Sequence, residues 1–600
     1  MKKKLIIILL IILSFGFFSC SDYLDRPPLD DIGNDQFWKT KSDLESYIFQ
    51  FYKNIKVLDY SANGYGATGV FSAEARGSDN AIDATKTAVP LLNGSRILPT
   101  SSPGSAPDIY SPSHWFWAEI RNVNVFLDNY IKCGDSFEIY KHILGEAYFF
   151  KALYYFDKVK YFGAVPWFVH SLDISSAELY KPRDPQPVVI DSVLSCLDKA
   201  ITYLNLVKNN TDKNNRLSKE AALVLKSRVA LYEGSWEKYH AGTPFVKGVS
   251  NPNKYFRIAV DAAEELMTPG KYTVGIYNPT NKPDDYGDLF GQVSYLNNSE
   301  VILWKQYSID LDLGNNLQAF LTTNTDAVSM TFELVQSFLG KDGNPIDYYT
   351  IGKTNKGTNF FTQIADICDP RLRKTIWFPN DVMWENENGT KTFKLPSLTL
   401  TLRQSNATGF QPRKGVNIKS KGAGAPGATT ATSTSETGGI VFRYAEVLLN
   451  YAEAKYELGE AVDYNKSINL LRKRAGMPNF KVLNDPTRSR HADFGYPISD
   501  ELQEIRRERR VELANEGLRL MDLMRWRAHN LFKGKRPLGY PFLFTEFPGK
   551  TYDMNADGFL DPYKKGLPSG YGFNPDRDYL EGIPTNEITL NNALVNNPGW

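Results

Sequence analysis

The sequence predicts an all-α dominated fold, a tetratricopeptide-like scaffold of helix pairs stacked into an alpha-alpha superhelix. Apolar residues recur at the spacing of amphipathic helices in both halves of the chain, and the stretches between them carry only short strand-like runs. Small residues such as Ala147, Ala152, Ala221 and Ala222 recur on the packing faces, which lets neighbouring helices approach closely. A strict repeat of about 34 residues is missing, so we expect diverged repeats interrupted by insertions.

The first half of the chain contains a series of segments with helical periodicity. In the stretch 139–162, Ile143, Ala147 and Phe150 begin an apolar stripe, and Gly163 follows its end. Antiparallel pairing of successive helices is the economical arrangement for such a series. The predicted helices are residues 42–53, 115–130, 139–162, 187–206, 218–234 and 256–267.

The second half combines further helix pairs with long irregular stretches. We expect helices at 443–458, 464–475, 500–516 and 517–529, and a strand in "EVILWKQY" at 300–307. Gly, Pro, Asn, Asp and aromatic residues dominate two long stretches, and loops of that length are usually functional or disordered. Their aromatic content argues against disorder. These stretches are 270–396 and 537–600, while 419–439 reads as a flexible insertion without chemistry.

The N-terminus has the features of a lipoprotein signal peptide. Three lysines precede an apolar run from Leu5 to Phe18, and Ser19 stands before Cys20, the predicted lipid acceptor. The alternatives are an ordinary secretory signal or a membrane anchor, but the run is shorter than the roughly 20 residues of a spanning helix. We therefore expect a signal peptide at 1–19 and one lipid-anchored domain at 20–600, with parts of about 20–330 and 331–600.

Composition and motifs exclude several classes of function. The chain has 69 basic and 68 acidic residues, so it lacks the clustered basic surplus of a nucleic-acid-binding protein. Beyond the leader the chain has three cysteines, Cys133, Cys196 and Cys368. Because this number is odd, a disulfide framework is not implied. The six histidines show no H-E-x-x-H spacing, and no G-x-S-x-G elbow or P-loop occurs. We therefore expect no enzyme activity; the alternative is a glycosidase, which needs two carboxylates at a set separation.

Several segments in order resemble the SusD/RagB family, surface lipoproteins of Bacteroidetes that partner TonB-dependent outer-membrane transporters. They include "RYAEVLLNYAEAKYELG" at 443–459, "IRRERRVELANEGLRLMDLMRW" at 505–526 and "PTNEITLNNALVNNPGW" at 584–600. The departures are small: Asn596 and Asn597 stand where the family more often has Gln-Asn, and Glu581-Gly582 where an aromatic residue or Trp-Pro is common. These departures concern the packing of the C-terminal tail.

The resemblance implies a non-catalytic, cell-surface glycan-binding lipoprotein of the outer membrane. It would capture oligosaccharides on the irregular face and deliver them to a SusC-like TonB-dependent transporter. The alternative within the family is a RagB-like protein that captures peptides. A structural or adhesin-like surface protein is the third reading.

A non-catalytic glycan site needs flat aromatic platforms beside polar side chains that pair with sugar hydroxyls. Loop aromatics next to Asn, Asp or Arg fit this requirement, and the resembling family uses the region before the helix that begins near residue 115. Structural packing is the alternative for each platform, and we expect Trp117 and Trp304 to be buried. The predicted ligand-binding residues are Arg76, Asp79, Asn80, Tyr110, Trp115, Tyr286 and Tyr295.

The segment "DMNADGFLDPY" at 553–563 reproduces the first nine places of an EF-hand calcium loop. Gly558 would make the sharp turn, but Lys564 replaces the bidentate Glu of position twelve. An Asx-rich turn without metal is the alternative, because Asp, Asn and Gly also dominate turns. The predicted ligands of a structural Ca²⁺ are Asp553, Asn555, Asp557, the carbonyl of Phe559, and Asp561.

The run "RRERR" at 506–510 is the basic cluster of the mature sequence. One reading is a surface for an acidic partner. The favoured reading is a structural helix laced by salt bridges, because Glu504, Glu508, Glu512 and Glu516 are interleaved with the arginines.

Overall fold

The structure is a computed structural model. The predicted signal peptide and Cys20 lie outside the residues that it describes. No helix within the described ranges has the length and apolar character needed to cross a membrane. The described residues are 37–55, 77–83, 89–105, 113–248, 250–323, 328–398, 406–420 and 435–600.

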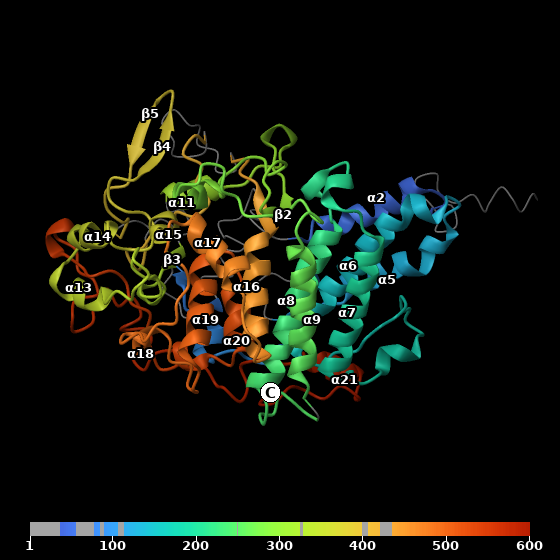
Figure 1. The fold of residues 1–600 in the computed structure, drawn as a ribbon. Helices are drawn as coiled ribbons and strands as arrows, with labels where there is room; N and C mark the ends of the chain where they lie inside the picture. Colours follow the sequence, from blue (N-terminus) through green and yellow to red (C-terminus); the bar gives the residue numbers. More distant parts are fainter. Residues whose placement is uncertain are drawn as a thin grey trace, which may run out of the picture.

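Long paired helices form the scaffold, as the sequence predicts (Figure 1). In the first half, α6 packs against α7, α7 against α8, and α8 against α9, while α2 and α5 pack on α6. The bounds are α2 (Lys41–Tyr52), α5 (Ala118–Asn129), α6 (Phe137–Phe162), α7 (Gln186–Tyr203), α8 (Lys219–Tyr239) and α9 (Pro252–Met267).

The second half continues the same layer of helices. Helix α16 packs between α9 and α19, and α20 contacts α8, so segments far apart in sequence share one scaffold (Figure 1). The predicted helix at 464–475 is a 3₁₀ turn at Tyr464–Lys466 followed by a short α-helix. The bounds are α16 (Tyr444–Glu457), α17 (Ile468–Arg474), α19 (Asp500–Glu512) and α20 (Arg519–Arg525).

Side chains at the N-termini fix where several of these helices begin. The Ser218 hydroxyl accepts a hydrogen bond from the Ala221 backbone N–H at 3.2 Å, and Ser499 does the same for Leu502 at 3.0 Å. Such caps satisfy N–H groups that have no partner within the helix.

The irregular stretches hold short helices and small antiparallel sheets. Those of residues 317–392 lie beside α17 and α19, at the left of Figure 1, whereas α21 and the C-terminal tail pass below the ends of the long helices. The expected strand at 300–307 is β2 (Val301–Lys305), paired with β6 (Gly439–Arg443). The other pairs are β1 (Ala81–Asp83) with β3 (Val328–Met330) and β4 (Val382–Asn386) with β5 (Gly389–Thr392). The short helices are α4 (Pro90–Asn93), α10 (Asp284–Asp288), α11 (Leu317–Thr323), α12 (Phe332–Val335), α13 (Tyr348–Thr354), α14 (Thr358–Ala365), α15 (Pro370–Thr375), α18 (Arg488–His491) and α21 (Thr585–Leu590).

The C-terminal end of the expected insertion at 419–439 is packed, which corrects that boundary. Ser435 and Thr437 are buried, and Ser435 exchanges backbone hydrogen bonds with Asn315 at 2.8 and 2.9 Å. The chain is therefore fixed from Ser435 into β6, and residues 421–434 lie outside the described ranges.

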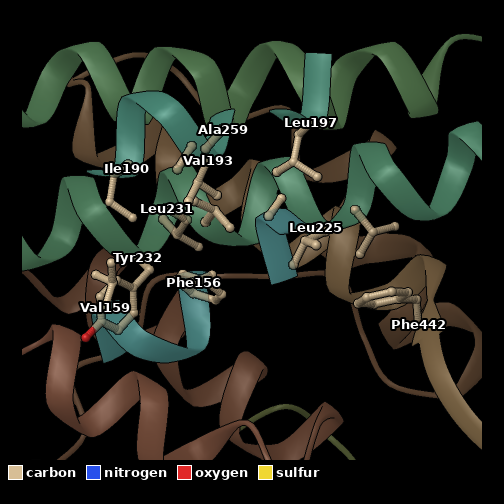
Figure 2. Packing of buried hydrophobic residues seen from close by; sticks show 14 of the residues in the cluster. Phe156, Val159, Ile190, Val193, Leu197, Leu225, Leu231, Tyr232, Ala259 and Phe442 are labelled. Atoms are coloured by element: carbon tan, nitrogen blue, oxygen red, sulfur yellow. The ribbon is translucent and has the colours of Figure 1, made fainter. Parts of the chain in front are cut away.

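Apolar side chains from successive helices make one continuous core (Figure 2). Phe156 of α6 packs edge-on against Tyr232 of α8, with ring centroids 5.4 Å apart, and Val159 of α6 and Val193 of α7 belong to the same cluster. Phe442 of β6 joins the same cluster, so the core also holds the second half of the chain.

A network of buried ion pairs is the second feature that holds the scaffold together. Arg506 to Arg510 are all buried on α19, which confirms the structural reading of the basic run. Arg509 pairs with Asp522 of α20 at 2.8 Å, and Arg525 of α20 pairs with Glu453 of α16 at 2.6 Å. Each guanidinium thus joins two helices.

Helix α19 also forms ion pairs with segments of the irregular side. Glu512 of α19 accepts hydrogen bonds from Arg443 of β6 at 2.8 Å and from Arg371 of α15 at 3.1 Å. Arg443 also bonds Glu300 before β2 at 2.8 Å. A buried charge is tolerated only with such partners, because taking an ion out of water costs several kcal/mol.

Removing one partner of a buried pair should destabilise the fold strongly. In Glu453→Ala, the indole N–H of Trp526 loses its acceptor in the interior, and Arg525 loses one of its two carboxylate partners. We expect the free energy of unfolding to fall by about 3–5 kcal/mol, measured by denaturant titration. Burial acts to raise the pKa of Glu453, but Arg525 outweighs burial and lowers this pKa to about 2. The wild-type advantage over the variant should therefore fade as the pH drops below the ordinary value of 4.5 toward 2.

The matched control is Asp198→Ala, which removes the surface pair with Lys226 at 2.5 Å. The Asp198 side chain is 59% exposed, so the change should stay within about 1 kcal/mol. Equal effects of the two substitutions would contradict the structural importance of the buried network.

Candidate functional site

Asp79 and Asn80, two of the predicted ligand-binding residues, lie just before β1 against the charged helices. Arg519 bonds both carboxylate oxygens of Asp79 at 2.7 and 2.9 Å, and Arg510 lies 3.0 Å from the same carboxylate. Arg510 also donates to the Asn80 side-chain oxygen at 2.8 Å. Burial acts to raise the pKa of Asp79, but the two guanidinium groups hold it well below its ordinary value.

These contacts give Asp79 and Asn80 an anchoring role. Asp79 is 7% exposed and Asn80 is 1% exposed, and Thr331 binds both backbone carbonyls, at 2.6 and 2.8 Å. Their polar groups are committed to the protein, so the structure corrects the expectation that they face a ligand. Sequence reasoning recognised the polar cluster but could not see its arginine partners more than 400 residues away.

The predicted aromatic platforms at Trp115, Tyr286 and Tyr295 are also buried, at 3%, 0% and 1% exposure. Trp115 packs edge-on against Trp117, with centroids 5.2 Å apart, and the Tyr286 hydroxyl donates to the Glu512 carbonyl at 3.2 Å. A ring enclosed on both faces offers no surface for a sugar, so packing accounts for these residues and corrects the platform interpretation.

The remaining residues of that prediction divide into two groups. Trp304 is 1% exposed and packs against Tyr295, with centroids 5.5 Å apart, as expected for a buried strand residue. Trp117 is half-buried against the core. Arg76 and Tyr110 lie outside the residues that the structure describes.

A shallow cleft lies beside Asp79, and it collects polar side chains from separate parts of the chain. Ser78, Glu333, Lys535 and Tyr571 line it. Its volume is about 20 Å³, room for roughly one water molecule. A sugar could therefore only lie across this cleft and not enter it.

Glu333 is the residue of this cleft that sequence reasoning missed. Burial raises its pKa to about 7, and both its side-chain oxygens accept from the Leu538 N–H at 3.3 Å. At neutral pH it therefore can donate or accept a hydrogen bond, which suits a hydroxyl partner. Nothing around Glu333 in the sequence signals this role, because its neighbours come from distant segments.

The predicted calcium loop holds its carboxylates against basic side chains. Asp561 is buried and pairs with Arg536 at 2.9 Å, while Asp553 lies 3.0 Å from Lys565. Asp557 lies 3.1 Å from Lys353. Each carboxylate that should face a metal is thus neutralised by a cation of the protein.

The rest of the loop is an Asx-rich turn. The Asn555 side-chain oxygen accepts from the N–H groups of Asp557 and Phe559, both at 3.0 Å, and the Phe559 carbonyl accepts from the Asn555 N–H at 2.9 Å. Gly558 has φ +82°, as the sharp turn requires. Across the described part of the chain, no cluster of three His, Cys, Asp or Glu residues could hold a metal. In this arrangement the donor set does not fit Ca²⁺.

A scaffold of paired helices with irregular segments on one side defines the class of this protein. The family model described as "SusD family" matches residues 299–600, and a second, "Starch-binding associating with outer membrane", matches residues 105–231. The chain therefore belongs to the SusD family.

Relatives and solved structures agree over most of the chain. SusD-like protein P38 of Formosa agariphila is 24% identical over 87% of this chain and 91% of its own length. A SusD-like carbohydrate-binding protein from Bacteroides fragilis covers 93% of this chain and 100% of its own, with 22% identity and a TM-score of 0.69. A laminarin-binding SusD-like protein covers 94% of this chain and 100% of its own, with 18% identity and a TM-score of 0.57.

The carboxylate pairing predicts that calcium does not stabilise this protein. Adding calcium or a chelator should leave the melting temperature unchanged, since only a ligand that binds the native state raises it. Asp561→Asn should lower the melting temperature equally with and without calcium, because it weakens the pair with Arg536. A melting temperature that calcium raises in the wild type but not in Asp561→Asn would show that this loop binds the metal.

Proposed function

We propose that this protein is a non-catalytic cell-surface lipoprotein that captures oligosaccharides and delivers them to a TonB-dependent outer-membrane transporter. The observation that carries the proposal is membership of the SusD family, combined with likeness to a carbohydrate-binding member over nearly the whole chain. The starch-binding description of the second matching model points the same way.

The geometry beside Asp79 supports binding without catalysis. Hydrolysis of a glycosidic bond needs two carboxyl groups on either side of an accessible sugar, one of them free to act as a nucleophile or base. Among the residues that line the described cleft, Asp79 is held by two arginines, so Glu333 has no second free carboxyl group beside it. The absence of metalloprotease, hydrolase-elbow and P-loop motifs from the sequence agrees with this role.

In this proposal Cys20 carries the lipid, and the helical scaffold stands outside the cell. Stable anchoring needs more than one acyl chain, which lipoprotein processing supplies. The transporter would contact the face that holds the helical repeats, by analogy with the family. A mature chain that remains in the periplasm without an acyl group would contradict this part.

The proposed glycan contacts are Arg76 and Tyr110. Arg76 stands next to Gly77 in the sequence, and the anchored pair Asp79 and Asn80 follows shortly after. Asp79 is fixed to Arg510 and Arg519, and Ser78, which precedes it, lines the cleft. The cleft side chains Glu333 and Lys535 would then pair with hydroxyls at the edge of the same ligand.

Retention of an unaltered polysaccharide tests the proposal. The purified protein should retain members of an insoluble polysaccharide panel, and chromatography should find their chain lengths unchanged after long incubation. Arg76→Ala combined with Tyr110→Ala should weaken retention, because stacking and charge-assisted hydrogen bonds are both lost. Shortened products would instead identify an enzyme.

The matched control is Arg121→Ala on the exposed side of α5, which should retain the polysaccharide as the wild type does. Unchanged retention by the double variant would place the glycan site elsewhere. Binding to a peptide library without binding to any glycan would favour the RagB-like alternative.

A further inference from the structure

A cavity of about 330 Å³ lies where the ends of α7 and α8 meet the C-terminal tail. The tail passes below these helix ends, near α21 (Figure 1). The exposed residues Pro182, Lys247 and Val595 lie on its wall, so the cavity opens to solvent. Its volume suits a ligand the size of one or two rings.

The packing of the tail builds one wall of this cavity. The Asn597 side-chain amide donates to the carbonyls of Phe162 and Glu581, at 3.1 and 2.7 Å, and the Asn596 side-chain oxygen accepts from the Ile583 N–H at 2.8 Å. The residues that depart from the common family pattern are therefore firmly packed. The cavity is a fixed part of the fold.

Arg183 is the main cation of the cavity wall. Its Nη1 donates to the Asn597 side-chain oxygen at 2.7 Å and to the Ala164 carbonyl at 3.2 Å, and Nη2 reaches the Asn596 carbonyl at 3.4 Å. All of these acceptors are neutral. Among the described residues no carboxylate forms an ion pair with Arg183, whereas the arginines of α19 have acidic partners.

Burial accordingly lowers the pKa of Arg183, with no opposing acidic neighbour. The group stays charged at neutral pH because an arginine titrates far above it. A half-buried, charged guanidinium bound only to neutral oxygens keeps its affinity for an anion. Its planar fork matches a carboxylate.

Glu233 also lines the cavity, and its carboxyl group is in a protonation state that does not repel an anion. It is fully buried, and one of its oxygens accepts from the Gln186 side-chain amide at 2.7 Å. The other oxygen has no hydrogen-bond partner within the described residues. Burial raises the pKa of Glu233 to about 8, so the group is mostly neutral at pH 7.

The rest of the wall is apolar, with Phe245, Val246 and Leu580 beside several prolines. Flat apolar walls favour the faces of a ring. Lys247 adds a second positive charge at the opening. The cavity thus combines room for a ring with a guanidinium that has no acidic partner and a neutral carboxyl group.

We propose that this cavity binds a small ring compound that carries one carboxylate, with the carboxylate on Arg183 and the ring against Phe245 and the prolines of the wall. The site uses none of the residues proposed for oligosaccharide capture, so it does not rest on that function. A carboxylated sugar and an aromatic acid share this chemistry. Separate probes distinguish the two sources.

Calorimetric titration of the full-length mature protein tests the site. D-glucuronate represents the carboxylated sugar and benzoate the aromatic acid, with D-glucose and benzyl alcohol as their neutral partners. We expect one acid to bind and its neutral partner to bind far more weakly. Arg183→Gln should weaken binding of that acid by about 10- to 100-fold, because a charged hydrogen bond is lost.

Two further variants keep the test decisive if Arg183→Gln disturbs the tail. Ala593→Phe places a ring inside the cavity and should abolish binding of the acid while retention of polysaccharide stays unchanged. Lys208→Gln removes an exposed lysine elsewhere and should bind as the wild type does. Failure of both acids to bind, equal binding of the neutral partners, or full binding by Ala593→Phe would overturn the proposal.

The site also predicts a pH dependence. As the pH rises through about 8, Glu233 becomes charged and repels the bound carboxylate, so the affinity should fall. Glu237 and Asp191 add negative charge near Glu233 and Lys254 adds positive charge, while Tyr255 stays protonated because burial raises its pKa. Glu233→Gln should bind the acid equally well on both sides of pH 8. An affinity that is constant with pH in the wild type would contradict the placement of the ligand beside Glu233.

Discussion

The buried ion pairs of α19 and α20 are the constraint on which the rest of the structure depends. Arginines and glutamates that would be expensive to bury alone are placed where helices, strands and irregular segments meet, and each needs its partners in position. Asp79 with Arg519 fixes the segment before β1, and Arg443 with Glu512 fixes β6. Order on the irregular side is thereby tied to order in the helices.

This constraint explains why polar residues of the irregular side mostly pair with other residues of the protein and are not available to a ligand. Asp79, Asn80 and Asp561 have the residue types of a sugar or metal site, yet each meets an arginine. Arg183 differs, because its acceptors are neutral oxygens. Because the arginines of α19 have acidic partners, a guanidinium that lines a cavity and has no such partner among the described residues is the feature that points to a ligand.

The sequence predicted the elements of the scaffold well, whereas five of the seven predicted ligand-binding residues are buried in the structure. The long helices fall where apolar periodicity placed them, because a helix with one buried face must repeat its apolar residues along the chain. Trp115, Tyr286 and Tyr295 look the same in sequence whether they are platforms or core, since aromatic residues serve both purposes. The "RRERR" run was read correctly as structural, although its arginines pair mostly with carboxylates of other segments, such as Asp79, Asp485 and Asp522, and not with the interleaved glutamates.

The sequence by itself determined the class of protein and the helical scaffold, because each is encoded in local spacing and in motifs that stand in order along the chain. Only the tertiary structure decided which polar residues are committed to the protein and which cavity has an unpaired charge. Glu333 beside Asp79, and Arg183 beside Glu233, come together from separate segments. Burial and pairing are properties of that assembly, and no local pattern records them.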